Sequence, residues 1–324
     1  MRRKDVLLIS VLSLLLVVGL LIDLNAGYAQ IPILELFSGN PILLNLRLPR
    51  VLGSILVGIG LSLSGAVLQG VTRNDMAEPG ILGINAGAGL AIAVFIVFFE
   101  GGQISSSLSY SLMMPILAFI GSALTFWIEY RLSYWHGKVH PKRMLLMGVA
   151  ISLAISSLTT ILMLQMPDSQ YAFVQNWIAG NIWGADWPNI ILLLIGISIL
   201  GWLVYSRSRT LNGLMLGHDT AVGIGIDVNK ESRILLISAV ALSAFCCSIG
   251  GGLSFIGLVA PHLSRKLAGP NYIHLLPVSA LTGGVLLVWA DIISRTWFLP
   301  YEMPVGITAA VIGAPYFLYL LVKE

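Results

Sequence analysis

Long apolar runs dominate this chain and place it in a membrane. Eight blocks of roughly membrane-crossing length lie near 6–22, 51–70, 81–99, 112–130, 144–165, 187–205, 274–293 and 305–322. A helix needs about 20 residues to cross a hydrocarbon core of about 30 Å. Only 10% of the residues are charged, whereas soluble domains carry about 25%. The sequence therefore predicts an all-α, polytopic membrane protein and excludes disordered, fibrous and disulfide-stapled classes.

One stretch leaves the number of spans open. Between Arg233 and Arg265 lie 31 residues without a formal charge, interrupted by glycines at 250–252. Two crossings, 234–250 and 253–264, give ten spans with both termini cytoplasmic and fifteen of the 18 Lys and Arg residues inside. A single crossing gives a split of 13 to 5. Because cytoplasmic loops are enriched in Lys and Arg, we predict ten spans, the eighth of them short and tilted or re-entrant.

The N-terminal segment resembles a signal peptide, with basic residues at 2–4, an apolar run and small residues at 27–29. We expect an uncleaved first helix instead, because its removal would leave an odd number of spans. The longest connections, 207–233 and about 166–186, are too short for a catalytic domain. We predict a single transmembrane domain over 1–324.

Motifs of catalysis and nucleotide binding are missing. The chain has no G-x-x-x-x-G-K-[ST], no H-E-x-x-H and no cluster among its five histidines. Ser254 and His262 lie eight residues apart, and an intramembrane hydrolase built on them is a weak alternative. The net charge of +3 is too small for a nucleic-acid surface. We expect no enzymatic activity, no metal site, no cofactor and no nucleic-acid partner, and we interpret Cys246 and Cys247 as core thiols.

Polar residues inside spans offer two candidate sites. Ser152, Ser156, Thr159 and Thr160 form a stripe on one helical face, which indicates either a water-lined pathway or hydroxyls bonded to their own helix. Asp291 and Arg295 lie four residues apart, the spacing of an ion pair within one helix.

Arginines are rare on the predicted outer side. Only Arg47, Arg50 and Arg295 fall there, all at span ends. Arginine binds carboxylates in a bidentate manner, so this group is suited to an anionic ligand or partner.

The segment 210–227 is unlike a solvated linker. Leu211, Leu214, Met215, Ala221 and Val222 recur at helical spacing, and Gly217, Gly223 and Gly225 separate short helices. This pattern predicts a docking element, or alternatively a helix lying on the membrane surface.

Several separated motifs carry a family resemblance that covers nearly everything from Asn45 to Leu321. They are Arg47-Leu-Pro-Arg50, Ser64 to Gly70, Asn74 to Pro79, Leu82 to Ala88, Gly180, Asp186-Trp187, Leu211-Asn212, Leu216-Gly217, Phe255 to His262, Arg265, Leu275-Leu-Pro277, Asp291 to Arg295, Glu302 to Gly306, Thr308 and Gly313-Ala-Pro315. In this order they resemble the FecCD-type permease family, the membrane subunits of ABC importers for ferric siderophores, haem and vitamin B12.

The resemblance implies that residues 1–324 form a single permease domain in the bacterial cell (inner) membrane, with a ten-helix fold like that of the vitamin B12 permeases. It implies a pair of permease subunits, the same chain or a paralogue, with the solute path between them. Two ABC ATPase subunits would bind ATP and dock on the loop at 207–233. The docking residues would be Leu211, Leu214, Leu216, Gly217, His218, Asp219, Ala221, Gly223 and Gly225. An extracellular or periplasmic solute-binding protein would dock on Arg47, Arg50 and Arg295 through its acidic residues.

The chain departs from the family pattern at a few positions. His218 stands where relatives have an acidic residue, with Asp219 next to it, and Asp75 stands where relatives have proline. The loop from His140 to Arg143 lies where relatives place a gate, and we assign no gate residue there.

The sequence leaves alternatives open for the substrate and for the energy source. We expect a ferric siderophore, the commonest substrate class of the family, with haem or cobalamin as alternatives. An ion-coupled secondary transporter using Asp291, Arg295 and Glu302 is the alternative from another class.

Overall fold

The computed structural model describes residues 3–26, 40–99, 108–135, 138–139, 141–182, 185–297 and 301–323. Within these ranges the chain is helical except for a hairpin of two short strands. The helices are α1 (Arg3–Asn25), the π-helical η2 (Leu43–Arg47), α2 (Leu48–Thr72), the 3-10 helix η3 (Pro79–Leu82), α3 (Ile84–Phe99), α4 (Leu108–Ser133), α5 (Pro141–Met163), α6 (Asp168–Ile178), α7 (Trp187–Ser206), α8 (Ser208–Met215), α9 (His218–Gly223), α10 (Val228–Gly250), α11 (Ile256–Ala268), α12 (Tyr272–Thr296) and α13 (Val305–Lys323). The strands β1 (Tyr134–Trp135) and β2 (Lys138–Val139) pair antiparallel.

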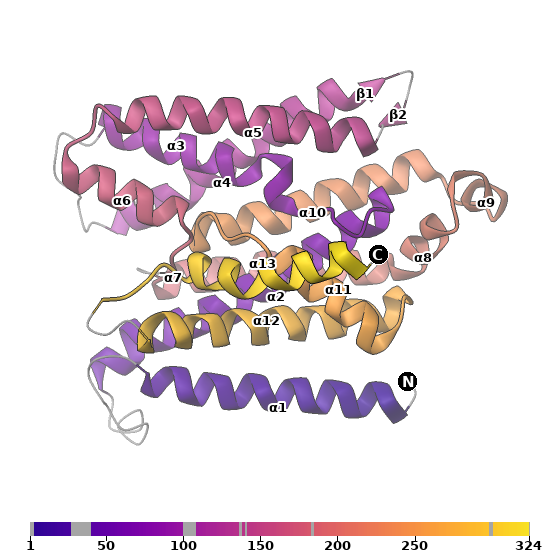
Figure 1. Ribbon diagram of the computed structural model, residues 1–324, viewed down its shortest axis with the longest axis horizontal. Coiled ribbons are helices and arrows are strands. Elements are labelled where there is room, and N and C mark those ends of the chain that lie inside the picture. The colour runs from indigo at the N-terminus through magenta and orange to yellow at the C-terminus, as the bar shows by residue number, and fades with distance from the viewer. Residues whose placement is uncertain are drawn as a thin grey trace.

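The long helices lie side by side and run between two ends of a bundle (Figure 1). Both marked termini, the hairpin and the short helices α8 and α9 lie at one end, which we call the basic end because Arg73, Arg131, Arg207, Arg209, Arg233, Arg265 and Lys266 lie in or beside its connections. Helix α6 lies at the opposite end (Figure 1). Two termini at one end require an even number of passages, as predicted.

Helix lengths confirm the predicted fold class. Among the described residues, seven helices are long and apolar enough to cross a membrane, and α3 and residues 305–319 of α13 are shorter apolar helices. Helix α11 completes the ten predicted passages but has only 13 residues. At 1.5 Å per residue it is about 20 Å long, which is too short for a core of about 30 Å. The predicted segment is thus a short helix, and its crossing of the membrane stays a prediction.

Helix α2 is the centre of the bundle. Of its apolar stretch 83% is buried, and α1, α7, α10, α11 and α12 all pack against it. The small residues of α2 permit this packing, because a Cβ on Gly58 or Gly65 would overlap the backbone of Gly283 or Gly257. Small residues at these positions therefore serve helix packing inside one chain.

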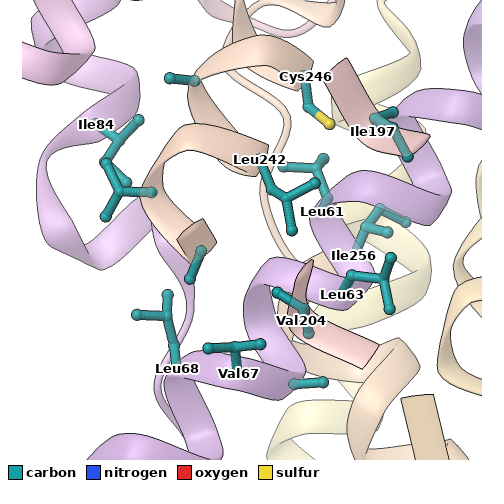
Figure 2. Packing of buried hydrophobic residues seen from close by; sticks show 14 of the residues in the cluster. Leu61, Leu63, Val67, Leu68, Ile84, Ile197, Val204, Leu242, Cys246 and Ile256 are labelled. Atoms are coloured by element: carbon teal, nitrogen blue, oxygen red, sulfur yellow. The ribbon is translucent and has the colours of Figure 1, made fainter. Parts of the chain in front are cut away.

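The hydrophobic core surrounds α2 (Figure 2). Figure 2 shows Leu61 of α2 near Ile197 of α7, Leu242 of α10 and Ile256 of α11. Cys246 belongs to the same cluster, and both cysteines are buried and free. The interpretation of the two thiols as core residues is confirmed.

Helix α1 is part of the bundle. It packs along α12, and Leu24 joins Val51, Val288 and Ile292 in a second cluster at the opposite end. The segment 27–29, which resembles a cleavage site, lies outside the described residues.

Candidate functional site

A cavity of about 280 Å³ lies beside α5 and contains the whole predicted hydroxyl stripe. Ser152, Ser156, Thr159 and Thr160 line it together, on the side formed by α5. The structure thus brings all four residues to one hollow.

The hydroxyls also bond their own helix. Ser152 donates to the Gly148 carbonyl at 2.7 Å, and Thr160 donates to the Ser156 carbonyl at 2.9 Å. Thr159 does the same with the Ile155 carbonyl at 2.9 Å. The interpretation as hydroxyls bonded to their own helix therefore holds for these three residues, and the water-lined pathway stays a prediction. A hydroxyl that donates its proton to the helix keeps lone pairs that can accept from a molecule in a cavity.

Gly252, in an interruption between α10 and α11, lines the cavity together with Ile178 and residues of η3 and α3. Residues 251–255 are not helical, and Gly251 adopts a φ of +66°. The Gly252 N–H donates to the Trp177 carbonyl at 3.2 Å. A Cβ on Gly252 would overlap the Ile178 carbonyl oxygen. The end of α6 therefore packs on this interruption backbone to backbone, a contact that only glycine allows.

Two further bonds fix this junction. The Asn85 side chain at the start of α3 donates to the Leu253 carbonyl at 3.1 Å. The Gly306 N–H of α13 donates to the Gly180 carbonyl at 2.9 Å. Segments from α3, α6, α11 and α13 thus meet beside the cavity. The glycines at 250–252 and 306 were the only sequence signal of this junction.

Glu78 attaches the connection between α2 and α3 to the same interruption. Its carboxylate accepts from the Phe255 N–H at 3.1 Å, and Phe255 has a φ of +67°. Burial raises the pKa of Glu78 to about 7, and the Phe255 N–H opposes that shift. Glu78 lies within a recognised motif, but the sequence did not indicate its partner.

Arg50 lies in a buried ion cluster at the opposite end. Its Nη2 lies 2.8 Å from Asp291 Oδ1, and its Nε lies 3.2 Å from Asp291 Oδ2. Its Nη1 lies 2.9 Å from Glu302 Oε2. Asp291 is fully buried, whereas the side chain of Glu302 is 39% exposed.

Arg295 pairs with a residue that sequence reasoning missed. Its Nη1 lies 2.9 Å from Oδ1 of Asp23, which is fully buried near the end of α1, and its Nη2 donates to the Ala26 carbonyl at 2.7 Å. The ion pairs of Asp291 and Arg295 therefore lead to other helices, to α2 and α1, instead of joining the two as neighbours in α12. A carboxylate inside a span was the available signal for Asp23, because such a charge requires a partner.

Arg47 completes the group of outer arginines. Its Nη1 donates to the Leu24 carbonyl at 2.8 Å. Arg47, Arg50 and Arg295 are each at most 7% exposed. The structure brings all three together around the ends of α1, α2 and α12, and their docking role stays a prediction.

Glu129 of α4 is another buried carboxylate that sequence reasoning missed. It is fully buried against α5, and neither carboxylate oxygen has a hydrogen-bond partner among the described residues. An oxygen of this carboxylate would lie 3.0 Å from a Cβ at Gly148.

The loop 207–233 forms two short helices, α8 and α9, as its glycine pattern predicted. Gly217 separates them with a φ of +104°. Among the predicted docking residues, Leu211, Leu214 and Ala221 are buried and hold the helices against the bundle. Seven exposed residues lie together on α8, α9 and the turns that follow them, and we call this set the exposed loop surface: Met215, Leu216, Asp219, Val222, Gly223, Ile224 and Gly225. His218 is half-buried and adjoins it.

Side-chain bonds connect this loop to the bundle. Asn212 of α8 donates to Asn271 Oδ1 at 2.9 Å and accepts from the Tyr272 N–H at 2.9 Å. Arg265 at the end of α11 contacts Gln69 of α2 and forms an ion pair with Asp75, the residue that replaces the family's proline. His140, in the loop where relatives place a gate, lies outside the described residues.

A bundle of apolar helices with a hydroxyl-lined cavity and an exposed amphipathic loop defines a membrane permease. Residues 15–323 match the FecCD transport family, and the chain belongs to this family. It is 42% identical over 330 residues to the iron(3+)-hydroxamate import system permease protein FhuG of Bacillus subtilis, covering 99% of this chain and 98% of that one. It is 36% identical over 335 residues to the hemin transport system permease protein HmuU of Yersinia pestis, covering 100% and 97%.

A solved structure has the same fold. It is an inward-facing ABC transporter of the proposed metal-chelate type, with a TM-score of 0.85 and 26% identity. The match covers 99% of this chain and 100% of that one.

Proposed function

We propose that this chain is the permease subunit of an ABC importer that moves a ferric siderophore of the hydroxamate type into the cytoplasm. The observation that carries the proposal is the cavity lined by Ser152, Ser156, Thr159 and Thr160. Its hydroxyl wall suits a polar iron chelate with many oxygen atoms. The 42% identical relative is named for iron(3+)-hydroxamate import; haem and cobalamin are the alternative substrates.

The cavity side of α5 supports pairing with a second permease subunit, the same chain or a paralogue. Only 11% of the apolar stretch of α5 is buried within the chain, although that helix carries the hydroxyl stripe. Lipid tails offer no hydrogen bonds to hydroxyls. A second subunit facing α5 would enclose the hydroxyls in a water-filled path.

The exposed loop surface supports docking of two ABC ATPase subunits. Leu216, Val222 and Ile224 are 62%, 53% and 58% exposed in helices that are held firmly by Leu211 and Leu214. Apolar patches rimmed by polar residues mark contact sites for other proteins. The ATPases would bind the ATP, and this chain needs no cofactor of its own.

The basic end would face the cytoplasm, because Lys and Arg are enriched on that side of membrane proteins. Both termini would then be cytoplasmic in a bacterial cell membrane. The external end would carry Arg47, Arg50 and Arg295 for the solute-binding protein. Glu302 is the exposed partner of Arg50, so an acidic residue of the binding protein would replace Glu302 and leave the buried Asp291 in place.

Uptake of a radiolabelled ferric hydroxamate tests the energy source. Cells would express this chain with or without its ATPase and binding-protein partners. We expect uptake only with both partners, and we expect it to continue when the proton gradient is collapsed at constant ATP. Uptake by this chain alone that follows the gradient would establish the secondary transporter instead.

A pair of neighbouring substitutions tests the cavity. Ser156→Leu narrows it, whereas Ser157→Leu is the matched control, because Ser157 is exposed and does not line it. We expect Ser156→Leu to lower uptake about tenfold or more, the effect of about 1.4 kcal/mol of steric cost. Equal uptake by the two variants, at equal amounts of protein in the membrane, would refute a path along α5.

A further inference from the structure

A second and larger hollow lies between α4 and α10. This groove has a volume of about 850 Å³ and shares no lining residue with the hydroxyl cavity. Phe119, Phe126 and Trp127 form its α4 wall, and Ile237 and Val240 form part of its α10 wall. Trp127 and Ile237 are 58% and 53% exposed. The groove is therefore open and apolar along most of its length.

The groove has the length of one membrane leaflet. From Phe119 to Arg131 α4 advances twelve residues, which is about 18 Å at 1.5 Å per residue. One leaflet of a hydrocarbon core of about 30 Å is about 15 Å thick. The groove thus extends from the basic end to about the middle of the membrane, which is the reach of an acyl chain from one leaflet.

Two arginines stand at the basic end of the groove. The Arg131 guanidinium lies 5.7 Å from the centre of the Trp127 ring. The Arg233 Nε donates to the Tyr130 hydroxyl at 3.1 Å. Among the residues that the structure describes, neither arginine forms an ion pair. By contrast, Arg207 and Arg265 at the same end pair with Glu231 and Asp75.

A smaller polar hollow adjoins the groove. It has a volume of about 300 Å³ and shares Tyr130, Tyr134 and Arg233 with the groove. Arg73 and Ser232 also line it. Arg233 therefore stands at the boundary between an apolar space and a polar space with further donors.

We propose that this groove binds an anionic phospholipid. The phosphate would lie between Arg131 and Arg233, the rest of the headgroup would enter the polar hollow, and one acyl chain would fill the groove. Basic pockets between membrane helices bind anionic headgroups in this way. Charge complementarity selects this occupant, because an apolar partner surface would leave two unpaired guanidinium groups beside it.

Lipid binding to the purified chain, with any partner subunits that copurify, tests the proposal. Native mass spectrometry in detergent would compare phosphatidylglycerol with phosphatidylcholine of the same acyl chains. We expect phosphatidylglycerol to bind about thirtyfold more tightly, because each basic residue near an anionic headgroup contributes about fivefold. Raised salt should weaken this preference.

Three variants separate the charge from its surroundings. Arg131→Gln combined with Arg233→Gln should abolish the preference, whereas Arg131→Lys combined with Arg233→Lys should retain most of it. Lys4→Gln removes a positive charge at the start of α1, also at the basic end, and should leave the preference for phosphatidylglycerol unchanged. Thermal unfolding would confirm that each variant is folded.

Filling the groove tests the place of the acyl chain. Ala241→Phe should weaken binding of both lipids equally and leave their ratio unchanged. Equal binding of the two lipids by the unmodified chain would overturn the proposal, as would a preference that survives the double Gln substitution. A second copy of the chain is the other occupant to test. If two Ile237→Cys chains form a disulfide in the membrane and no longer bind lipid, the groove is covered by a second copy and the proposal is overturned.

Discussion

Removing the charge of Asp23 should loosen α1 from the bundle. Asp23→Asn keeps the shape of the side chain and an acceptor oxygen, but it leaves the Arg295 guanidinium, 4% exposed, with neutral acceptors instead of a carboxylate. Removing one partner of a buried ion pair costs about 3–5 kcal/mol. We expect a loss of about 3 kcal/mol in the free energy of unfolding, at the lower end of that range, because the amide oxygen and the two backbone carbonyls still accept hydrogen bonds from Arg295.

The double-mutant cycle gives the sharper number. Arg295→Met alone leaves the Asp23 carboxylate buried without a cation and should also cost at least about 3 kcal/mol. The double variant contains neither charge, so it should cost no more than about 3 kcal/mol in total, which gives a coupling energy of about 3 kcal/mol or more. Equilibrium unfolding in mixed micelles with increasing sodium dodecyl sulfate would measure all four proteins.

The control is Asp219→Asn, which makes the same change at an exposed position of α9 and should alter stability by less than about 0.5 kcal/mol. Additive effects of Asp23→Asn and Arg295→Met would refute the reasoning, since additivity means that the two side chains do not depend on each other. An unchanged free energy of unfolding for Asp23→Asn would also refute the reasoning, because it would show that Arg295 does not require the charge of Asp23.

Three further results are expected. Gly252→Ala should lower the free energy of unfolding by about 3 kcal/mol or more and should lower uptake, because its Cβ overlaps the α6 backbone. The control Gly201→Ala in α7 makes only an ordinary contact, so thermal unfolding should show an unchanged or raised stability. Burial raises the pKa of Glu78 to about 7, so the contribution of Glu78 to stability should be fully present below the unfolded pKa of about 4.5 and be lost as the pH rises through about 7. Glu78→Gln should remove this pH dependence from thermal unfolding profiles, and a variant with an unchanged pH profile would contradict the prediction. Glu129→Met should raise stability by about 1–3 kcal/mol, because a buried carboxylate without a partner is replaced by an apolar side chain of similar length, and uptake should be unaffected; loss of uptake would assign Glu129 a role in transport.

The fold was largely predictable because its signals are local. Apolar runs of membrane-crossing length indicate helices without reference to the rest of the chain. The glycines of the loop 207–233 separate α8 from α9, as their spacing predicted. Helix α6 was not predicted, because its eleven residues are only moderately apolar and their backbone contacts with Gly251 and Gly252 are distant in sequence.

The candidate site was predictable where its residues share one helix. Ser152, Ser156, Thr159 and Thr160 lie on one face of α5 by periodicity alone, and the structure places them at one cavity. The ion cluster was different. The i, i+4 rule favoured a pair within α12, whereas the structure pairs its two members with residues on α2 and α1, far away in sequence. No local pattern contains that information, since it depends on which helix ends meet.

The bonds of the structure connect the exposed loop surface to the wall of the cavity in a few steps. Asn212 attaches α8 to the first residues of α12, and the Tyr272 hydroxyl there lies within 3.5 Å of Arg265 at the end of α11. The other end of α11 follows directly after Phe255, whose N–H donates to the Glu78 carboxylate. If a partner subunit docks on the exposed loop surface, as we propose, a displacement of α8 would reach the non-helical residues 251–255 through one short helix. That segment packs on the end of α6 through hydrogen bonds and backbone contacts of glycine, so a shift of the segment would be transmitted to α6 and to the wall of the cavity.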